Sequence, residues 1–331
     1  MSLTSPEYPV TNAPGRDSDG SMHRRITRYA LPAILLLLLV IASLTTPGFF
    51  TFDNLRAVLI NSSIVGIVAV SMTPVTLSGN FFSLGAAQST MLSALIFLSA
   101  VGGGQPIWVG VMVSLIVLIV IGALQAIVVA AGLNPIITTL AAGSVIFGVA
   151  TFVTGGRVVT ANGADISWIA TESWAGLPLP VYAFFIVTLV VTLLVKRTVA
   201  GRRVSLLGAN SAAAAVSGIS AWTTTLWAFL IMSVGMALAG VLVAGQLGQI
   251  TTSDLSSLTI DTVAAVLVGG TAIQGGDGSP LRSAVGALII VILGNVMVLQ
   301  GFPTGIRTLG VGLLVVIVVS VLHLTRKAAA R

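Results

Sequence analysis

Few side chains in this sequence are suited to acid–base, nucleophilic or metal chemistry. The only histidines, His23 and His323, lie near opposite ends of the 331 residues, and cysteine is absent. A metal site needs several ligands brought together, and a thiolate nucleophile needs a cysteine. The chain also has no H-E-x-x-H sequence. We therefore expect no catalytic residues and no metal site, so the chain is not predicted to be an enzyme.

Nucleotide binding is not predicted either. The phosphates of ATP are commonly cradled by a G-x-x-x-x-G-K-S/T loop, and this sequence has none. Its two lysines, Lys196 and Lys327, follow no glycine-rich loop. We expect no cofactor in this chain, and any dependence on ATP must come from a partner protein that binds it.

Asp261 is the one ionisable residue that we place in or near the interior of an apolar segment. Proton-coupled carriers usually need buried carboxylates or histidines as a relay, so a single carboxylate argues against such a carrier. Asp261 either lies at a helix start, where the helix dipole stabilises a carboxylate, or takes part in a transport path. Polar side chains in lipid-embedded segments need partners or a path, and the candidates for a path are Asn80, Asn134, Thr138, Thr139, Asn295 and Gln300.

The apolar composition of the chain predicts which elements position these residues. Hydrophobic residues make up 56% of the chain and charged residues 7%, and the mean hydropathy is +1.09. A soluble domain has roughly 25% charged residues, so lipid must be the solvent for most of the chain. A span needs about 20 apolar residues, and the uncharged stretches predict an all-α, polytopic membrane protein with about ten transmembrane helices. We place them near 30–46, 61–78, 83–101, 107–131, 136–155, 180–195, 222–246, 259–274, 283–301 and 305–323.

The basic residues predict the orientation of these spans, because Lys and Arg are enriched in cytoplasmic loops. Ten spans from a cytoplasmic N-terminus put only Arg56, Arg157 and Arg307 outside. Both termini are then cytoplasmic, with a disordered tail over 1–28, a transmembrane domain over 29–325 and a basic tail over 326–331. Topology thus explains the excess of 15 Lys and Arg over 9 Asp and Glu, and no nucleic acid partner is expected.

The largest cytoplasmic segment is predicted near 197–220, between the sixth and seventh spans. Asn210 or Ser211 can cap a helix by accepting a backbone N–H, residues 212–216 suit a helix, and Gly218 suits its left-handed end. A helix of about two turns is not stable alone in water. We therefore expect it to pack against its own bundle or against a partner protein.

This segment resembles the cytoplasmic loop of the membrane permease subunits of ribose-type ABC sugar importers, in the branched-chain amino acid and sugar permease superfamily. The family pattern is G-R-x-x-x-A-I-G-x-N-x-x-A-A-x-x-S-G-I. The resemblance implies that the segment couples the permease to an ATP-hydrolysing subunit. The positions that carry the match are Gly201, Arg202, Gly208, Asn210, Ala213, Ala214, Ser217, Gly218 and Ile219.

A second stretch, over 261–290, resembles that family's I-A-A-V-V-I-G-G-T-S-L-x-G-G-x-G signature. Gly269, Gly270 and Thr271 lie in it. Glycine pairs let backbones approach closely and turn sharply, which a helix break beside a translocation path requires. Packing alone also accounts for them.

Two further stretches match less closely. The family's G-G-I-D-L-S-V-G turn corresponds to 78–85, with Phe81 in place of the customary Asp, and its P-P-F-I-V-T-L-G segment corresponds to 134–141. An apolar ring thus replaces a group that could bind hydroxyls, which leaves the substrate open. The predicted substrate path comprises Asn80, Phe81, Asn134, Thr138, Thr139, Gly269, Gly270, Thr271 and Asn295.

The resemblance implies a type II-like ABC importer permease fold and import of a sugar (pentose, hexose or related polyol) across the cytoplasmic (inner) membrane of a bacterium by alternating access. The implied partners are an ABC ATPase subunit, a periplasmic or lipoprotein solute-binding protein, and a second permease subunit that forms a homo- or heterodimer. The alternatives are a branched-chain amino acid or nucleoside ABC permease, an ATP-independent secondary carrier or channel, and a membrane scaffold.

Overall fold

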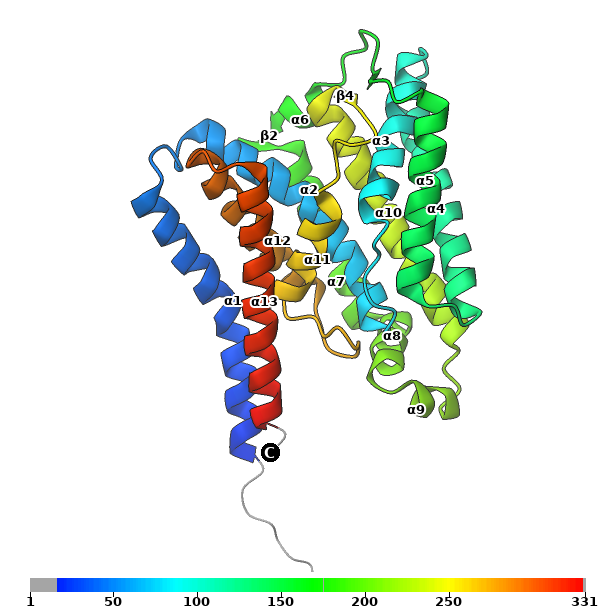
Figure 1. The fold of residues 1–331 in the computed structure, drawn as a ribbon. Coiled ribbons are helices and arrows are strands. Elements are labelled where there is room, and N and C mark those ends of the chain that lie inside the picture. The colour runs from blue at the N-terminus through cyan, green and yellow to red at the C-terminus, as the bar shows by residue number, and fades with distance from the viewer. Residues whose placement is uncertain (1–16, 175, 330–331) are drawn as a thin grey trace, which may run out of the picture.

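The computed structural model describes residues 17–174 and 176–329 of the chain (Figure 1). Within these residues it has thirteen α-helices and four strands of two residues each, which confirms the predicted all-α class. The strands form two antiparallel pairs, β1 with β4 and β2 with β3. The elements are α1 (Asp17–Thr45), α2 (Phe52–Leu77), α3 (Ala86–Gly102), α4 (Ile107–Ala130), α5 (Pro135–Thr154), β1 (Val159–Thr160), α6 (Trp168–Thr171), β2 (Ser173–Trp174), β3 (Leu177–Pro178), α7 (Leu179–Arg197), α8 (Val199–Ala209), α9 (Ser211–Val216), α10 (Ala221–Leu247), β4 (Gln249–Ile250), α11 (Leu258–Val268), α12 (Pro280–Leu299) and α13 (Thr304–Ala329).

Ten apolar helices coincide with the ten predicted spans. Among the described residues, six are long and apolar enough to cross a membrane, namely α2, α4, α5, α7, α10 and α12. The other four contribute shorter apolar stretches: Leu31–Thr45 in α1, Ala86–Gly102 as α3, Leu258–Val268 as α11 and Thr304–Ser320 in α13. The chain is therefore a multi-pass membrane protein.

The predicted span over 259–274 is wrong in its last third. α11 ends at Val268 and has 11 residues, about 16 Å at 1.5 Å per residue, roughly half the hydrocarbon thickness of about 30 Å. Gly269 caps its end and Gly270 takes φ +75°, a left-handed conformation that suits glycine. These two glycines end a helix, as expected, and the backbone is not helical again until Pro280.

Both predicted tails contain helix. α1 begins at Asp17, inside the tail predicted over 1–28, and α13 runs to Ala329, inside the basic tail predicted over 326–331. Residues 1–16 and 330–331 of these predicted tails lie outside the described residues. The first and last helices thus extend beyond the predicted transmembrane domain of 29–325.

α2 lies at the centre of the bundle and contacts α7, α10, α11 and α12. Every residue over 62–77 is buried. A Cβ added to Gly235 of α10 would collide with the side chain of Ser71 in α2, and one added to Gly240 would lie 2.5 Å from Ser93 Cβ in α3. Helices in lipid associate through such small-residue contacts, so these glycines set the close spacing of α10 against α2 and α3.

The bundle has two distinct ends (Figure 1). α8 and α9 lie at one end with the start of α1 and the end of α13, and β1, β4 and α6 lie at the other. Basic residues at the end of α7 and in α8 group at the first end, which we call the basic end: Lys196, Arg197, Arg202 and Arg203. The start of α2, the end of α5 and the start of α13 lie at the opposite end of the bundle (Figure 1), and the three basic residues predicted on the other side lie near them: Arg56, Arg157 and Arg307.

Candidate functional site

A cavity of about 810 Å³ lies at the opposite end of the bundle, between α2, α10, α11, α12 and α13. Apolar side chains such as Ile64 and Val291 line part of it, and polar side chains line much of the rest. Small-molecule pockets typically measure about 300–1,000 Å³, so it has room for a small solute. Its wall includes Asn54, Asn61, Gln246, Asp261, Asn295 and Arg307.

Side-chain hydrogen bonds at this cavity join helices that are distant in sequence. Asn54 Nδ2 donates to Asn295 Oδ1 (3.1 Å), and Asn295 Nδ2 donates to Asn54 Oδ1 (2.8 Å), which ties α2 to α12. Gln246 Nε2 donates to Asn61 Oδ1 (3.3 Å), which ties α10 to α2. The structure therefore places Asn295, a predicted path residue, in the wall of a cavity.

Two opposite charges, Asp261 and Arg307, also line this cavity, together with the exposed Asp254. Asp261, in the first turn of α11, accepts a hydrogen bond from Ser257 and lies close enough to Arg307 to interact with it electrostatically. They form no direct ion pair, since the one ion pair among the described residues joins Arg282 to Asp277 (3.0 Å). Arg307 Nε is buried and has no hydrogen-bond partner among the residues that the structure describes. A carboxylate and a guanidinium thus face one cavity without touching.

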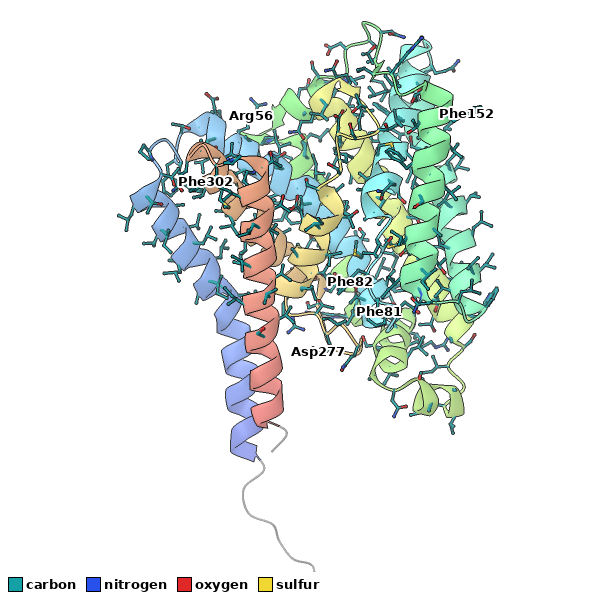
Figure 2. All side chains as sticks on the ribbon, in the orientation of Figure 1. Arg56, Phe81, Phe82, Phe152, Asp277 and Phe302 are labelled. Atoms are coloured by element: carbon teal, nitrogen blue, oxygen red, sulfur yellow. The ribbon has the colours of Figure 1, made fainter. Side chains whose placement is uncertain are left out.

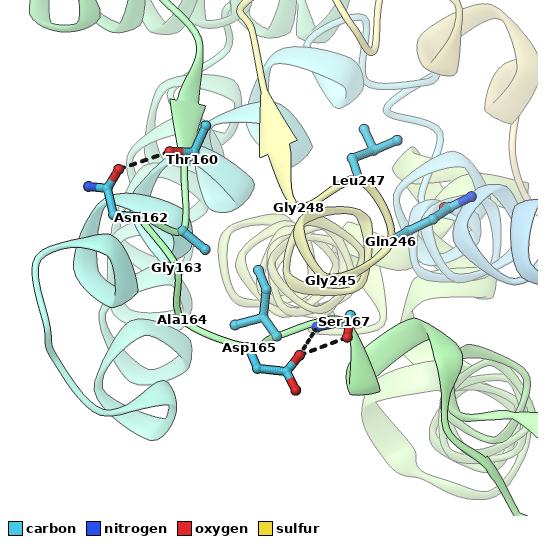
Figure 3. Close-up of a pocket in the computed structure, with 12 residues that line it drawn as sticks. Thr160, Asn162, Gly163, Ala164, Asp165, Ser167, Gly245, Gln246, Leu247 and Gly248 are labelled. Atoms are coloured by element: carbon cyan, nitrogen blue, oxygen red, sulfur yellow. Dashed lines mark hydrogen bonds between the residues drawn. The ribbon is translucent and has the colours of Figure 1, made fainter.

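A second hollow of about 350 Å³ lies at the same end, between residues 160–167 and 245–248 (Figure 3). Its polar groups pair with one another. Asp165 Oδ1 accepts from Ser167 N (3.1 Å) and Ser167 Oγ (2.7 Å), and Thr160 Oγ1 donates to Asn162 Oδ1 (2.9 Å). Paired groups have fewer hydrogen bonds left for a ligand, so the larger cavity is the better candidate. Neither hollow holds a metal cluster, because no three His, Asp or Glu side chains converge within the described ranges.

Inside the bundle, the non-helical segment 78–85 leads from α2 to α3. Thr139 Oγ1 of α5 accepts a hydrogen bond from Leu84 N (3.1 Å), and a Cβ on Gly85 would lie 2.7 Å from Thr139 O. Ala87 N, at the start of α3, donates to Thr259 Oγ1, at the start of α11 (3.0 Å). The first turns of two short helices thus meet inside the bundle, and such discontinuous helices are typical of transporter sites. Thr139, a predicted path residue, is buried in this contact.

Asn134 and Thr138, also predicted for the path, lie at the exposed start of α5. Asn134 Oδ1 accepts a hydrogen bond from Ile136 N (2.9 Å), and Thr138 Oγ1 donates to Asn134 O (3.0 Å). These bonds satisfy groups that a helix start leaves unpaired. Neither residue lines the two hollows.

Phe81 has a left-handed backbone, with φ +57°. This conformation is uncommon for bulky residues and is enriched in Asn and Asp. An Asp, which the resembled family pattern has at this position, would therefore suit the turn itself, and Phe81 adopts the turn at a cost in strain. Figure 2 shows Phe81 and its neighbour Phe82 in the lower half of the bundle.

At the basic end three backbone segments touch directly. A Cβ on Gly208, near the end of α8, would collide with Leu77 O at the end of α2, and one on Gly275 would lie 2.7 Å from Gly79 Cα. Gly276 N donates a hydrogen bond to Leu77 O (2.9 Å). We call Leu77, Gly79, Gly208, Gly275 and Gly276 the glycine junction. Side chains at its glycines would force these backbones apart.

Asn80 lies beside the glycine junction. Its Nδ2 donates to Ser78 Oγ (2.8 Å) and to Thr225 Oγ1 of α10 (3.2 Å). The bond to Thr225 ties the segment 78–85 to the helix that follows α9. The structure thus brings together Asn80, predicted for the path, and Gly208, predicted for coupling.

Gly269, Gly270 and Thr271 lie where the chain leaves α11 for the junction. A Cβ on Gly269 would lie 2.7 Å from Arg282 O of α12. Thr271 is buried, and its Oγ1 has no hydrogen-bond partner among the described residues. None of the three lines the larger cavity, so their positions favour helix ending and packing.

The predicted coupling segment forms two helices where one was expected. Asn210 Oδ1 accepts from Ala213 N (3.0 Å) and caps α9, and Gly218 takes φ +75° beyond its end, so both caps are as expected. α8 was not expected as a helix. Its first turn is capped by Thr198 Oγ1, which accepts from Gly201 N (3.1 Å).

The matched positions of this segment differ in exposure. Ala214 is buried against the protein, whereas Arg202, Ala213 and Ser217 are exposed. The neighbouring Val216 is 92% exposed. α9 therefore presents an apolar patch at the tip of the basic end, which its own bundle does not cover.

Five residues of these two regions were not singled out as site residues in the sequence analysis: Asn54, Asn61, Leu77, Gln246 and Arg307. Arg307 was counted only as a marker of topology, and Leu77 has an ordinary apolar side chain whose carbonyl makes the contact. Asn54 pairs with a residue 241 positions away. No local spacing links such partners, whereas Gly275 and Gly276 of the junction had a signal as members of the glycine-rich signature.

Comparison with known proteins agrees with this architecture. Residues 54–320 match the family described as branched-chain amino acid transport system / permease component. The chain is 31% identical to the ribose import permease protein RbsC of Haemophilus influenzae, over 86% of this chain and 90% of that protein. It is 28% identical to the galactofuranose transporter permease protein YtfT of Escherichia coli, over 81% and 82% of the two chains. It is 26% identical to the L-arabinose transport system permease protein AraH of Escherichia coli, over 85% of each chain.

No solved structure matches the chain significantly. The family match nevertheless extends from the start of α2 to the last third of α13, so it includes the cavity, the glycine junction and α9. This chain therefore belongs to the branched-chain amino acid transport system / permease component family.

Proposed function

We propose that this chain is the transmembrane permease subunit of an ATP-binding cassette importer and that its cargo is a sugar. The observation that carries the proposal is similarity, over most of the chain, to permeases named for ribose, galactofuranose and L-arabinose. The architecture supports it, because a multi-pass bundle with a solute-sized polar cavity suits transport.

Energy for transport comes from other chains in this proposal. The sequence has no phosphate-binding lysine loop, so an ABC ATPase subunit would bind and hydrolyse ATP. A solute-binding protein would deliver the sugar at the opposite end, and a second permease subunit would complete the path for alternating access. The basic end faces the cytoplasm in this arrangement, since Lys and Arg are enriched there, and both termini are then cytoplasmic.

α8 and α9 are the proposed docking site for the ATPase. They project from the basic end (Figure 1), and Ala213 and Val216 are exposed to water there. An apolar patch at an aqueous end is better explained by a protein partner than by lipid. Arg202 and Arg203 add positive charge beside it.

The glycine junction is the proposed route from that dock to the transmembrane helices. Gly208 of α8 rests against the carbonyl of Leu77, and Gly276 N bonds to the same carbonyl. Backbones in direct contact transmit a displacement without side-chain rearrangement, because close-packed interiors have low compressibility. A shift of α8 would thus reach α2 and the loop before α12 together.

The experiment that tests the proposed function is ATP hydrolysis by the purified complex. We would purify the chain in mild detergent with the ATPase and solute-binding protein encoded beside it, and add ribose, L-arabinose, galactose, nucleosides or leucine in turn. One stimulating sugar is expected. Stimulation only by leucine or a nucleoside would replace sugar by the other cargo, and a folded chain that binds no ATPase would contradict the ABC assignment.

The proposed docking of the ATPase on α9 can be tested by placing charges on its exposed apolar patch. Ala213→Asp with Val216→Asp should abolish co-purification of the ATPase and uptake, because two desolvated carboxylates in an apolar contact are costly. The variant should still insert and run as a monodisperse protein, since both positions are exposed. Ala164→Asp, on an exposed residue of the opposite end, is the matched control and should dock normally; equal docking by both variants would place the ATPase elsewhere.

A further inference from the structure

The wall of the larger cavity is suited to hydroxyl groups. Asn54, Asn295, Asn61 and Gln246 supply carboxamides, which donate and accept hydrogen bonds. The Asn54–Asn295 pair does not use all of this capacity. Asn295 Nδ2 makes one hydrogen bond among the described residues, although it carries two N–H groups.

The charges in the wall are arranged for a bridging ligand. Asp261 can only accept hydrogen bonds when ionised, and Arg307 can only donate them. Both face the cavity, interact electrostatically and make no direct ion pair within the described part of the chain. A hydroxyl group donates one hydrogen bond and accepts others, so adjacent hydroxyls on one molecule can satisfy both charges at once.

The balance of charge favours a neutral ligand. The wall holds the carboxylates Asp254 and Asp261 against the guanidinium of Arg307. Asp254 is exposed, and its Oδ2 accepts from Thr251 N (2.7 Å), which leaves Asp261 and Arg307 as one opposite pair. An anionic solute would meet two carboxylates, Asp254 and Asp261, against one guanidinium. A zwitterionic aliphatic amino acid would match the pair but would leave the carboxamides facing its hydrocarbon part, and unpaired polar groups make sites reject such ligands.

We propose that this cavity is a binding site for the transported sugar, in which Asp261 and Arg307 contact neighbouring hydroxyls and Asn295 contacts a further one. This inference rests on the proposed function and adds the position of the cargo at the opposite end of each permease chain. The volume of about 810 Å³ accommodates a monosaccharide with water around it. The first turn of α11, which carries Asp261, also contacts the start of α3 through Thr259, so an occupied cavity touches the discontinuous helices inside the bundle.

The test uses the assembled transporter and the sugar that stimulates its ATP hydrolysis best. Asp261→Asn and Arg307→Gln should each raise the KM for uptake by about tenfold or more, as expected when a charge-assisted hydrogen bond is lost. The matched controls change the same groups at the same end of the bundle: Asp165→Asn in the smaller hollow and Arg157→Gln on an exposed residue. Both controls should keep the wild-type KM.

Site-directed labelling provides a measurement that does not depend on the charge variants folding. The chain has no cysteine, so Thr304→Cys, which lies in the cavity wall, carries the only thiol. The sugar should slow its reaction with a maleimide at least about threefold, and should not slow the reaction of Asn162→Cys in the smaller hollow.

The outcomes separate this inference from the proposed function. Sugar-stimulated ATP hydrolysis with an unchanged KM in both charge variants and no protection of Thr304→Cys would overturn the cavity site and leave the proposed function standing. Protection of Thr304→Cys by leucine and not by any sugar would overturn the assignment of the ligand. If no sugar stimulates hydrolysis or protects the thiol, both proposals fail.

Discussion

The larger cavity has a volume of about 810 Å³, and polar side chains from several helices line it. At the glycine junction, in contrast, three backbones touch with no side chain between them. The cavity has room and unused hydrogen-bonding capacity, which a binding site needs. The junction has neither room nor unused hydrogen-bonding groups. A contact that transmits movement should be closely packed, because close-packed interiors have low compressibility. We therefore expect the cavity to be sensitive to polarity and the junction to be sensitive to size.

Gly208→Ala should give the largest effect, because it adds one methyl group at the junction. The new Cβ would collide with the carbonyl of Leu77, and overpacking of this kind costs about 1–3 kcal/mol. We expect a lower unfolding temperature and loss of sugar uptake in proteoliposomes. Gly148→Ala in α5 is the matched control, since a Cβ there meets nothing within 4 Å. Equal stability and uptake in the two variants would show that the junction is not tight.

Asn295→Leu tests the cavity by changing polarity at similar size. It leaves Asn54 without its reciprocal partner, and an unsatisfied polar group costs about 1–3 kcal/mol. The double variant Asn54→Leu with Asn295→Leu removes both partners and should recover part of that loss in thermal unfolding. A double variant that loses the sum of the two single effects would mean that the pair does not couple α2 to α12.

Phe81→Asn should give the smallest effect on stability. Phe81 lies in the segment 78–85, which leads from the junction into the bundle. Relief of a left-handed backbone is worth about 1 kcal/mol, and the lost apolar contact of a half-buried ring works against it. Phe82→Asn is the matched comparison, because Phe82 is also half-buried but has no positive φ. Phe81→Asn should therefore be the less destabilising by about 1 kcal/mol, and the reverse order in thermal unfolding would exclude strain at Phe81.

Local patterns predicted most of the elements correctly. Uncharged stretches located the ten apolar helices, and Asn210 and Gly218 marked the ends of α9. The pattern failed for α11 because residues 269–274 carry no charge and so continue the uncharged stretch, while the glycines at 269 and 270 end the helix. It also missed α8, whose sequence mixes arginines and glycines with apolar residues.

The candidate site was only partly predictable. Asn295 and Asp261 drew attention because polar groups in apolar segments are costly, and both line the cavity. Thr139, Asn134 and Thr138 drew attention for the same reason, yet their hydrogen bonds serve a helix contact and a helix cap. Sequence could not tell these cases apart, because both put a polar side chain next to apolar neighbours.

By itself the sequence determined that the chain lies in lipid, where most of its apolar helices lie and which end carries the basic residues. Hydropathy, charge and helix capping depend on neighbours along the chain. Only the tertiary structure decided that Asp261 and Arg307 share a cavity, that Asn54 meets Asn295, and that Gly208 and Gly276 meet Leu77. These contacts join residues far apart in sequence, and the packing of whole helices, which no local pattern encodes, sets their distances.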